Sequence, residues 1–346
     1  MIDYIIVGAG LGGIAFSEIA LQNNKQVFVI NDDSQNSSLV AAGLYNPVIL
    51  KRFTLAADAE RHLTFIIPFY QKIEDRFNIK FMFEMPVYRR FFSAEEQNDW
   101  FIAADKPGLN KFLSSNIVRR NFQNIESPFG YGEVLHTGYV DTDLFLKTYK
   151  EQLKLTNNLL EKSFDFSLLS VRDDHVQYKN IKAKHIVFAE GFGMLNNPFF
   201  NYLPLDGTKG ELLIIKAPEL KLDIAINSGV FILPIGNDFY RVGATYEWND
   251  KTPLPTSTGL KELTKKLEEL ISCEYEIVDH LAGIRPTVKD RNPLIGTHPD
   301  YRNVHILNGL GTRGVMIGPP LAQDLFNYIE YAIPVARNTD IFRFKK

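Results

Sequence analysis

The feature that most constrains the fold is a glycine-rich turn close to the start of the sequence. Residues 2–7 form a short apolar run rich in β-branched side chains, which is typical of a buried parallel strand. Three glycines at G-x-G-x-x-G spacing follow at once, residues 14–21 have helical character, and residues 26–30 predict a second strand. This order of strand, turn, helix and strand is the context that supports a dinucleotide-binding site.

Each glycine of the turn has its own physical role. Gly8 permits the tight turn out of the strand, Gly10 lets the backbone approach a pyrophosphate, and Gly13 lets the helix pack close to the sheet. Around them, Ala9 and Leu11 belong to a helix start whose free N–H groups and positive dipole end favour phosphates. A tight turn without a ligand is the alternative, and the surrounding pattern disfavours it.

The residue after the second strand departs from the common pattern. An acidic side chain usually accepts hydrogen bonds from an adenosine ribose there. Asn31 holds that place, and Asp32 and Asp33 follow. Either the amide oxygen of Asn31 or the carboxylate of Asp32 contacts the ribose, and a solvated turn explains the two aspartates equally well. No Lys or Arg is near enough to favour the 2′-phosphate of NADP.

A second glycine cluster lies in the C-terminal third of the chain. Residues 304–307 predict a short strand, residues 308–316 contain the glycines, and Gly318-Pro319-Pro320 is expected to open a helix, because proline suits a first turn. A nicotinamide protein has no evident need of this junction. A flavin dinucleotide is long enough to bind one helix start through its pyrophosphate and the other through its ring. A plain glycine-rich turn is the alternative.

Composition excludes several classes of protein. There are 38 Lys and Arg against 41 Asp and Glu, a net charge of −3, which argues against a dominant polyphosphate partner. A single cysteine, Cys273, excludes a disulfide framework and zinc or iron–sulfur clusters, so no metal site is expected. The apolar runs are shorter than the ~18 residues of a membrane span, and Asp3 argues against a signal peptide. We expect a soluble, cytoplasmic protein of roughly two domains.

The middle of the chain predicts further elements. Residues 58–77 have the spacing of an amphipathic helix. Residues 81–92 predict a strand, and residues 210–216 and 229–246 predict longer strands of an antiparallel sheet.

A set of short motifs, in this order, resembles the FAD-dependent amine and amino-acid oxidase superfamily, the group of D-amino acid oxidase, glycine oxidase and sarcosine oxidase. The motifs are Gly8 to Gly13, Ala41-Ala42-Gly43, Gly138-Tyr139-Val140-Asp141, Ala189-Glu190-Gly191, Lys209-Gly210-Glu211, Gly283-Ile284-Arg285-Pro286 and Gly309 to Gly314. The last of these looks most like the flavin domain of the tRNA wobble-uridine modifying enzyme. Asn31 and Glu190 depart from the family pattern. No cysteine or histidine stands at an evident flavin-tethering position, which implies non-covalent FAD.

The resemblance implies an α/β fold in which a Rossmann-like FAD-binding domain is interleaved with an α+β substrate domain built on an antiparallel sheet. The FAD-binding domain would comprise residues 1–80, 141–205 and 281–346. The substrate domain would comprise residues 81–140 and 206–280.

The resemblance also implies the residues that bind FAD. They are Gly8, Ala9, Gly10, Leu11, Gly13, Asn31, Asp32, Ala42, Gly43, Phe164, Ala189, Gly191, Gly309, Gly311, Thr312, Arg313, Gly314, Val315 and Met316. Among them, Arg313 either faces the electron-rich side of the flavin ring, where a positive group favours the reduced form, or points to solvent.

On the substrate side, Arg285 is the best candidate to clamp a carboxylate, because a guanidinium offers a planar bidentate fork. The alternative is an ordinary ion pair with a carboxylate such as Asp290. Tyr246 either lines the substrate pocket or is a core aromatic residue.

Two further candidates follow the small-residue turn at Ala42 and Gly43. Tyr45 would form a wall of the pocket, and Lys51 or Arg52 would bind oxygen, substrate or a tRNA phosphate. A packed tyrosine and two solvated charges explain the same residues equally well.

These residues lead to a functional hypothesis. The protein would oxidise the C–N bond of a small amino acid or N-substituted amino acid by hydride transfer to flavin N5, and the imine would then be hydrolysed. One alternative is oxidative removal of a carboxymethyl group from a modified tRNA wobble uridine, which the acidic charge disfavours. Another is a flavin-binding sensor or scaffold without turnover. The substrate, the electron acceptor and the oligomeric state stay open.

Overall fold

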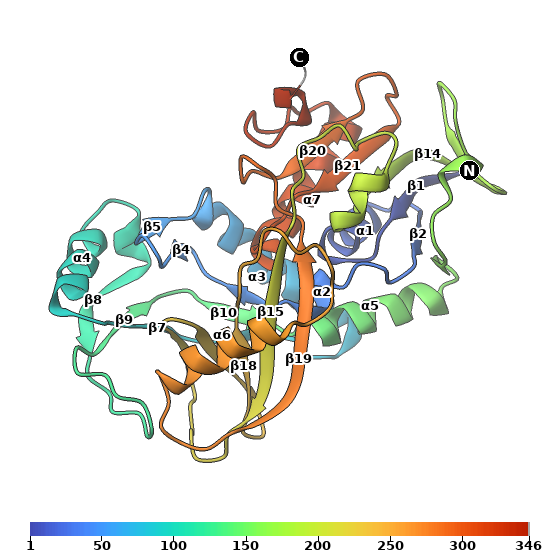
Figure 1. Ribbon diagram of the computed structural model, residues 1–346. Coiled ribbons are helices and arrows are strands. Elements are labelled where there is room, and N and C mark those ends of the chain that lie inside the picture. The colour runs from blue at the N-terminus through green and yellow to red at the C-terminus, as the bar shows by residue number, and fades with distance from the viewer. Residues whose placement is uncertain (345–346) are drawn as a thin grey trace.

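The computed structural model describes residues 1–344, and one of its two large sheets is a mixed sheet that contains the N-terminal strand (Figure 1). Its strands follow the order β11-β2-β1-β14-β13-β12, and β21 pairs with both β14 and β20. The strands are β1 (Ile2–Val7), β2 (Val27–Asn31), β11 (Leu159–Glu161), β12 (Leu169–Val171), β13 (Val176–Tyr178), β14 (Ile181–Phe188), β20 (Leu294–Thr297) and β21 (Val304–Asn308). The strands β11, β2, β1, β14 and β21 run parallel, so their carboxyl ends share one edge.

Helices cover this sheet and bury its apolar strands. The helix α7 packs against both α1 and α3. Across both halves of the molecule, the α-helices of the described chain are α1 (Leu11–Gln22), α2 (Ser37–Val40), α3 (Ala59–Phe77), α4 (Ala94–Ala104), α5 (Thr142–Leu155), α6 (Ser257–Glu268) and α7 (Gly314–Tyr331). Every residue of β21 is buried, as expected for a strand covered on both faces.

A second large sheet, mostly antiparallel, forms the other half of the molecule (Figure 1). Its order is β19-β15-β18-β17-β16-β7-β9-β8. The strands are β7 (Val87–Arg90), β8 (Leu113–Val118), β9 (Tyr131–Val134), β15 (Thr208–Lys216), β16 (Ala225–Asn227), β17 (Phe231–Gly236), β18 (Phe239–Gly243) and β19 (Glu276–Arg285). The long strands β15 and β19 run side by side through the middle of the molecule, and α6 packs on β15 and β18.

Short strands link the two halves. The sheet β3-β10-β6 joins β3 (Leu44–Tyr45), β10 (Gly138–Val140) and β6 (Met82–Glu84), and β4 (Val48–Ile49) pairs with β5 (Thr54–Leu55). The predicted α/β class, with a Rossmann-like sheet and a second antiparallel sheet, is confirmed. The domain boundaries stay a prediction. The strand β19 runs across the predicted boundary between residues 280 and 281.

The structure corrects the predicted start of the last helix. The helix α7 begins at Gly314 and not at Gly318, so Pro319 and Pro320 lie inside it. Helical hydrogen bonds form before the prolines, because the N–H of Ile317 already donates to the carbonyl of Arg313 at 3.0 Å. Pro319 has no N–H for the carbonyl of Val315, and the Tyr70 hydroxyl donates to that oxygen instead at 3.0 Å.

Two predicted strands are each divided. Residues 81–92 form β6 and β7, which belong to different sheets, and residues 229–246 contain the hairpin of β17 and β18. Asn237 and Asp238 make the hairpin turn, with φ of +53° and +62°. Asparagine and aspartate tolerate this left-handed backbone, which is why the chain reverses there.

Candidate functional site

A large cavity with a volume of about 1660 Å³ lies between the two halves of the molecule. Its walls come from the residues that follow β1, β14 and β21, from β15 and β19, and from the loops beside them. Ligands of open α/β sheets bind outside the carboxyl ends of the parallel strands, which is where this cavity lies. Because small-molecule pockets measure about 300–1,000 Å³, the space suits a long ligand together with a smaller one.

The turn after β1 forms one end of the cavity. Gly8 has a φ of +103°, a conformation that other residues rarely adopt. A Cβ on Gly13 would lie 1.9 Å from the carbonyl oxygen of Gly8, so only glycine lets α1 approach the strand this closely. Gly10 and Leu11 line the cavity at the first turn of α1, which contains no acidic residue. The positive end of the helix dipole therefore faces the space.

Asn31 stabilises this turn from the end of β2. Its amide oxygen accepts a hydrogen bond from the N–H of Ala9 at 2.9 Å, and its amide nitrogen donates to Asp33 at 2.7 Å. The ammonium group of Lys150 lies 2.8 Å from the same Asp33 carboxylate. Asn31 thus lines the cavity with its acceptor oxygen already engaged.

The same end of the cavity carries two carboxyl groups, those of Asp32 and Glu190. Burial alone would raise the pKa of Asp32, but hydrogen bonds from Ser34 and Ser163 outweigh it and lower that pKa. Burial raises the pKa of Glu190 to about 7, although Asn197 donates a hydrogen bond to its Oε2 at 2.6 Å. The sequence motifs identified Glu190 only as a departure from the family pattern.

The second glycine cluster lies at the same cavity. Its predicted residues that line the space are Gly309, Gly311, Thr312, Arg313, Gly314, Val315 and Met316. The two turns are neighbours, because a Cβ on Gly12 would lie 3.5 Å from the side chain of Leu310 and one on Gly314 would lie 3.0 Å from that of Leu11. The fold therefore brings together two helix starts that are far apart in the sequence.

Arg285 stands at the end of β19 and lines the cavity from the second sheet. Its guanidinium donates to the carbonyl oxygens of Thr245 at 3.1 Å and Lys209 at 3.5 Å, and lies 4.6 Å from the centre of the Tyr246 ring. Within residues 1–344 no carboxylate pairs with it, and burial lowers its pKa. Asp290, the partner considered from the sequence, is held by Arg343 at 2.8 Å instead.

The remaining predicted residues divide into two groups. Those that line the cavity are Ala42, Gly43, Lys51, Phe164, Ala189, Gly191 and Tyr246, and Arg52 is with them. Ala9 and Gly13 lie behind the lining. Tyr45 is buried beside it, and its hydroxyl donates weakly to the carbonyl of Phe83 at 3.4 Å. The pocket-wall role proposed for Tyr45 would therefore have to act through its neighbours.

The sequence reasoning did not identify Trp248, which lines the cavity and is 42% exposed. Tyr246 and Trp248 are aromatic residues two positions apart in the segment that follows β18, and both line the cavity. This spacing is the signal that could have found Trp248.

No helix in the described part of the chain is long and apolar enough to cross a bilayer. Residues 1–344 also contain no group of three His, Cys, Asp or Glu side chains arranged to hold a metal ion.

Comparison with known proteins gives a family match across most of the chain. Residues 3–327 match the model of the family described as FAD dependent oxidoreductase. Glycine oxidase of Bacillus subtilis is 26% identical over 211 residues, which cover 56% of this chain and 57% of that protein. The tRNA 5-methylaminomethyl-2-thiouridine biosynthesis bifunctional protein MnmC of Marinobacter nauticus is 27% identical over 203 residues, which cover 52% of this chain and 32% of that protein. The chain thus spans about a third to somewhat over half of these curated relatives.

Solved structures show the same fold over nearly the whole chain. Iminodiacetate oxidase from Chelativorans sp. BNC1 has a TM-score of 0.81 at 15% identity and covers 97% of this chain and 98% of its own. Glycine oxidase from Geobacillus kaustophilus has a TM-score of 0.76 at 18% identity, with 98% of both chains covered.

The residues of the cavity fit FAD. The glycine turn at Gly8 and the positive dipole end of α1 suit a pyrophosphate, and Ser38, whose hydroxyl accepts from the N–H of Leu11 at 3.2 Å, lies beside this helix start. The second helix start, at Gly314, lies beside the first and lines the same space. A dinucleotide with a large ring therefore finds both binding elements in one cavity.

Proposed function

Because the chain belongs to the FAD-dependent oxidoreductase family, we propose that it oxidises the carbon–nitrogen bond of a small amino acid or N-substituted amino acid. FAD, when bound, accepts the hydride from the carbon beside the substrate nitrogen. The observation that carries the proposal is the guanidinium of Arg285, which lines the cavity without a carboxylate partner within residues 1–344. A partly buried cation without a carboxylate partner favours an anionic ligand.

In this proposal the protein binds and orients the substrate. Arg285 binds the substrate carboxylate, and the ring of Tyr246 supports the guanidinium from one side. Arg313, the N-cap residue of α7, has its pKa lowered by burial and has no carboxylate partner in the described chain. Its positive charge favours the reduced form of the cofactor. The Glycine oxidase and iminodiacetate oxidase relatives support this class of substrate.

Anaerobic reduction of the purified protein tests the proposal. We expect flavin absorbance at about 450 nm that bleaches with glycine, N-methylglycine or a D-amino acid. Arg285→Lys keeps the charge and loses the fork, so the KM should rise by about tenfold or more. Arg120→Met, which removes an arginine paired with Asp223 at the surface, is the control.

The outcomes separate the alternatives. A colourless protein that cannot be loaded with FAD would contradict the proposal. Stable FAD binding without reduction by any amine would favour a flavin-binding sensor or scaffold.

A second candidate is oxidation of a carboxymethylated amine on a tRNA wobble uridine. Lys51 and Arg52 support it, because they line the cavity mouth and no carboxylate of the described chain pairs with either. Phe92, 53% exposed, lines the same mouth, and exposed aromatic rings can stack on bases. The Marinobacter relative supports it further.

Salt-dependent tRNA binding tests this candidate. We expect Lys51→Ala with Arg52→Ala to weaken binding and to reduce the dependence of log K on log salt. Lys261→Ala with Lys265→Ala removes the same charge from the exposed face of α6 and is the control. Absence of tRNA binding at low salt would exclude the candidate.

A further inference from the structure

The segment 244–256 joins β18 to α6 and covers the substrate side of the cavity. It supplies Tyr246, whose ring contacts the Arg285 guanidinium, and the Thr245 carbonyl oxygen that accepts from it. Trp248 lies two residues further on and also lines the cavity. The position of Arg285 therefore depends on where this segment lies.

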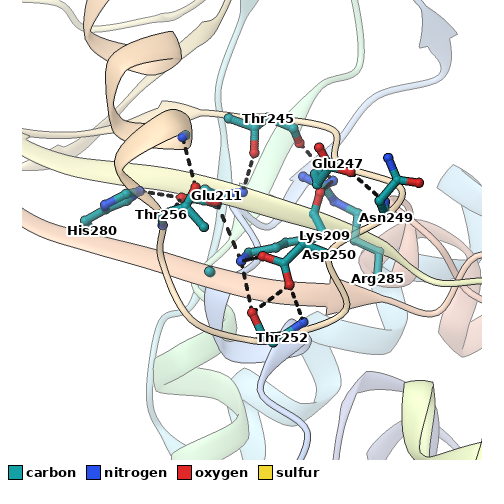
Figure 2. A network of polar contacts seen from close by, with 12 residues as sticks. Lys209, Glu211, Thr245, Glu247, Asn249, Asp250, Thr252, Thr256, His280 and Arg285 are labelled. Carbon is teal, nitrogen blue, oxygen red and sulfur yellow. Dashed lines mark hydrogen bonds and ion pairs between the residues drawn. The ribbon is translucent and has the colours of Figure 1, made fainter.

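A buried lysine on the neighbouring strand fastens the segment. Figure 2 shows Lys209 of β15, fully buried, reaching Asp250, and the ammonium nitrogen lies 2.5 Å from Asp250 Oδ2. The backbones of Lys209 and Glu247 also exchange two hydrogen bonds, of 2.9 and 3.0 Å. Thr252 donates its hydroxyl and its N–H to Asp250 Oδ1 at 2.7 and 2.8 Å and so orients that carboxylate.

The second carboxylate near Lys209, that of Glu211, interacts mainly with other residues. Glu211 lies 3.8 Å from the ammonium group and accepts hydrogen bonds from the N–H and hydroxyl of Thr256 at 2.9 and 2.8 Å. His280 lies 2.8 Å from the same carboxylate. Asp250 is thus the close partner of the buried ammonium ion, and a buried charge requires such a partner.

We propose that Lys209 is a positioning residue whose ion pair with Asp250 fastens the segment 244–252 over the cavity and so holds the Arg285 guanidinium in its ligand-binding orientation. This inference rests on the proposed function, in which Arg285 binds the substrate carboxylate. Neither Lys209 nor Asp250 lines the cavity, so the pair affects the substrate only through the position of the segment. Its role differs from that of the surface pair Lys221 and Asp238, which links the loop after β15 to the β17–β18 turn and does not line the cavity.

The test uses the FAD-loaded protein and Asp250→Asn, with Asp238→Asn as the matched control. One readout is the affinity for acetate, a carboxylate without an amine, followed through the flavin spectrum. The other is acrylamide quenching of tryptophan fluorescence, which reports on Trp248 because Trp100, the other tryptophan, is fully buried. We expect Asp250→Asn to weaken acetate binding by about tenfold or more and to increase quenching, with FAD affinity unchanged.

Other outcomes would overturn the proposal. Unchanged acetate affinity in Asp250→Asn would do so, whether or not quenching rises, and so would unchanged quenching. If that variant does not fold, Thr252→Val keeps both charges and should shift both readouts in the same direction by a smaller factor, and no shift would again overturn the proposal. Lys209→Arg, which keeps the cation, should retain more acetate affinity than Lys209→Met.

Failure of the proposed function would look different. In that case no amine would reduce the flavin of the unmodified protein, whereas the effects of Asp250→Asn on acetate binding and quenching would persist.

Discussion

The two ends of the cavity are built from different parts of the polypeptide. At the end formed by β1, α1 and α7, glycines of two turns, among them Gly8, Gly10 and Gly311, line the cavity, and a Cβ on Gly13 behind them would lie 1.9 Å from the Gly8 carbonyl oxygen. At the end formed by β15 and β19, the lining consists of side chains, of which Arg285, Tyr246 and Trp248 are the largest. The first end suits a cofactor that many proteins share, and the second suits a substrate that differs between them.

This difference determines how each end responds to change. Where the backbone itself forms the contact, as at Gly8 and Gly13, the site tolerates almost no added atom, because the peptide groups cannot move without disturbing the sheet. Where side chains form the site, an added atom costs less free energy of unfolding, because a side chain can move aside. The geometry of such a site, however, depends on the neighbours that hold each side chain. The following substitutions test that contrast, from the largest expected effect to the smallest.

Gly13→Ala should have the largest effect. The new methyl group would meet the Gly8 carbonyl oxygen at 1.9 Å, and the backbone would have to shift, at a cost of more than about 3 kcal/mol. We expect loss of FAD binding and a large fall in the midpoint of urea unfolding. Gly318→Ala in α7 is the control, because its nearest neighbours would lie at 3.5 and 3.8 Å and Gly318 does not line the cavity. Equal FAD content in the two variants would contradict the explanation.

Glu190→Gln tests the carboxyl group at the cofactor end whose pKa is raised by burial. With a pKa of about 7 when folded, against about 4.3 when unfolded, Glu190 binds more protons in the native state between these values. Stability should therefore fall as the pH rises from about 4.5 to 7, by up to about 3 kcal/mol, and Glu190→Gln should remove that part of the slope.

The measurement is urea unfolding of the FAD-free protein at several pH values. Glu151→Gln, at an exposed position of α5, is the control. If the curves of wild type and Glu190→Gln stay parallel between pH 4.5 and 7.5, burial does not penalise this carboxylate.

Gly210→Ala should have the smallest effect on the free energy of unfolding, and its main effect should be weaker substrate binding. Its methyl group would lie 2.0 Å from the Arg285 guanidinium, which is the mobile end of a long side chain and can move away. We expect normal FAD content and a KM about tenfold higher. Gly229→Ala, with its nearest neighbour at 3.9 Å, is the control. A large loss of FAD in Gly210→Ala would show that the two ends are less separable than the structure implies.

The sequence predicted the backbone-made end well. The order of strand, glycine turn and helix is local, and the glycine spacing reflects steric limits that act within a few residues. The second glycine cluster was found in the same way, although the sequence placed the start of α7 too late. The carbonyl oxygen of Val315, which Pro319 leaves without a helical donor, accepts a hydrogen bond from Tyr70. Tyr70 is remote in sequence, so no local pattern shows that Pro319 is tolerated inside the helix.

The side-chain-made end was predicted less completely. Arg285 was singled out through its motif, but the sequence did not predict that its guanidinium would lack a carboxylate partner within residues 1–344. That outcome depends on Asp290 pairing with Arg343. The pairing of Lys209 with Asp250 carries no local signal, because the two residues come together only when the segment after β18 crosses β15.

By itself, the sequence determined the Rossmann-like order of elements, the two glycine-rich helix starts and the family, since each depends on spacing along the chain. Only the tertiary structure decided that both helix starts line one cavity, that Asn31 holds the first turn, and that Arg285 faces the space unpaired within residues 1–344. The physical reason is that burial and the choice of charge partners depend on contacts between residues far apart in the chain, which no local pattern records.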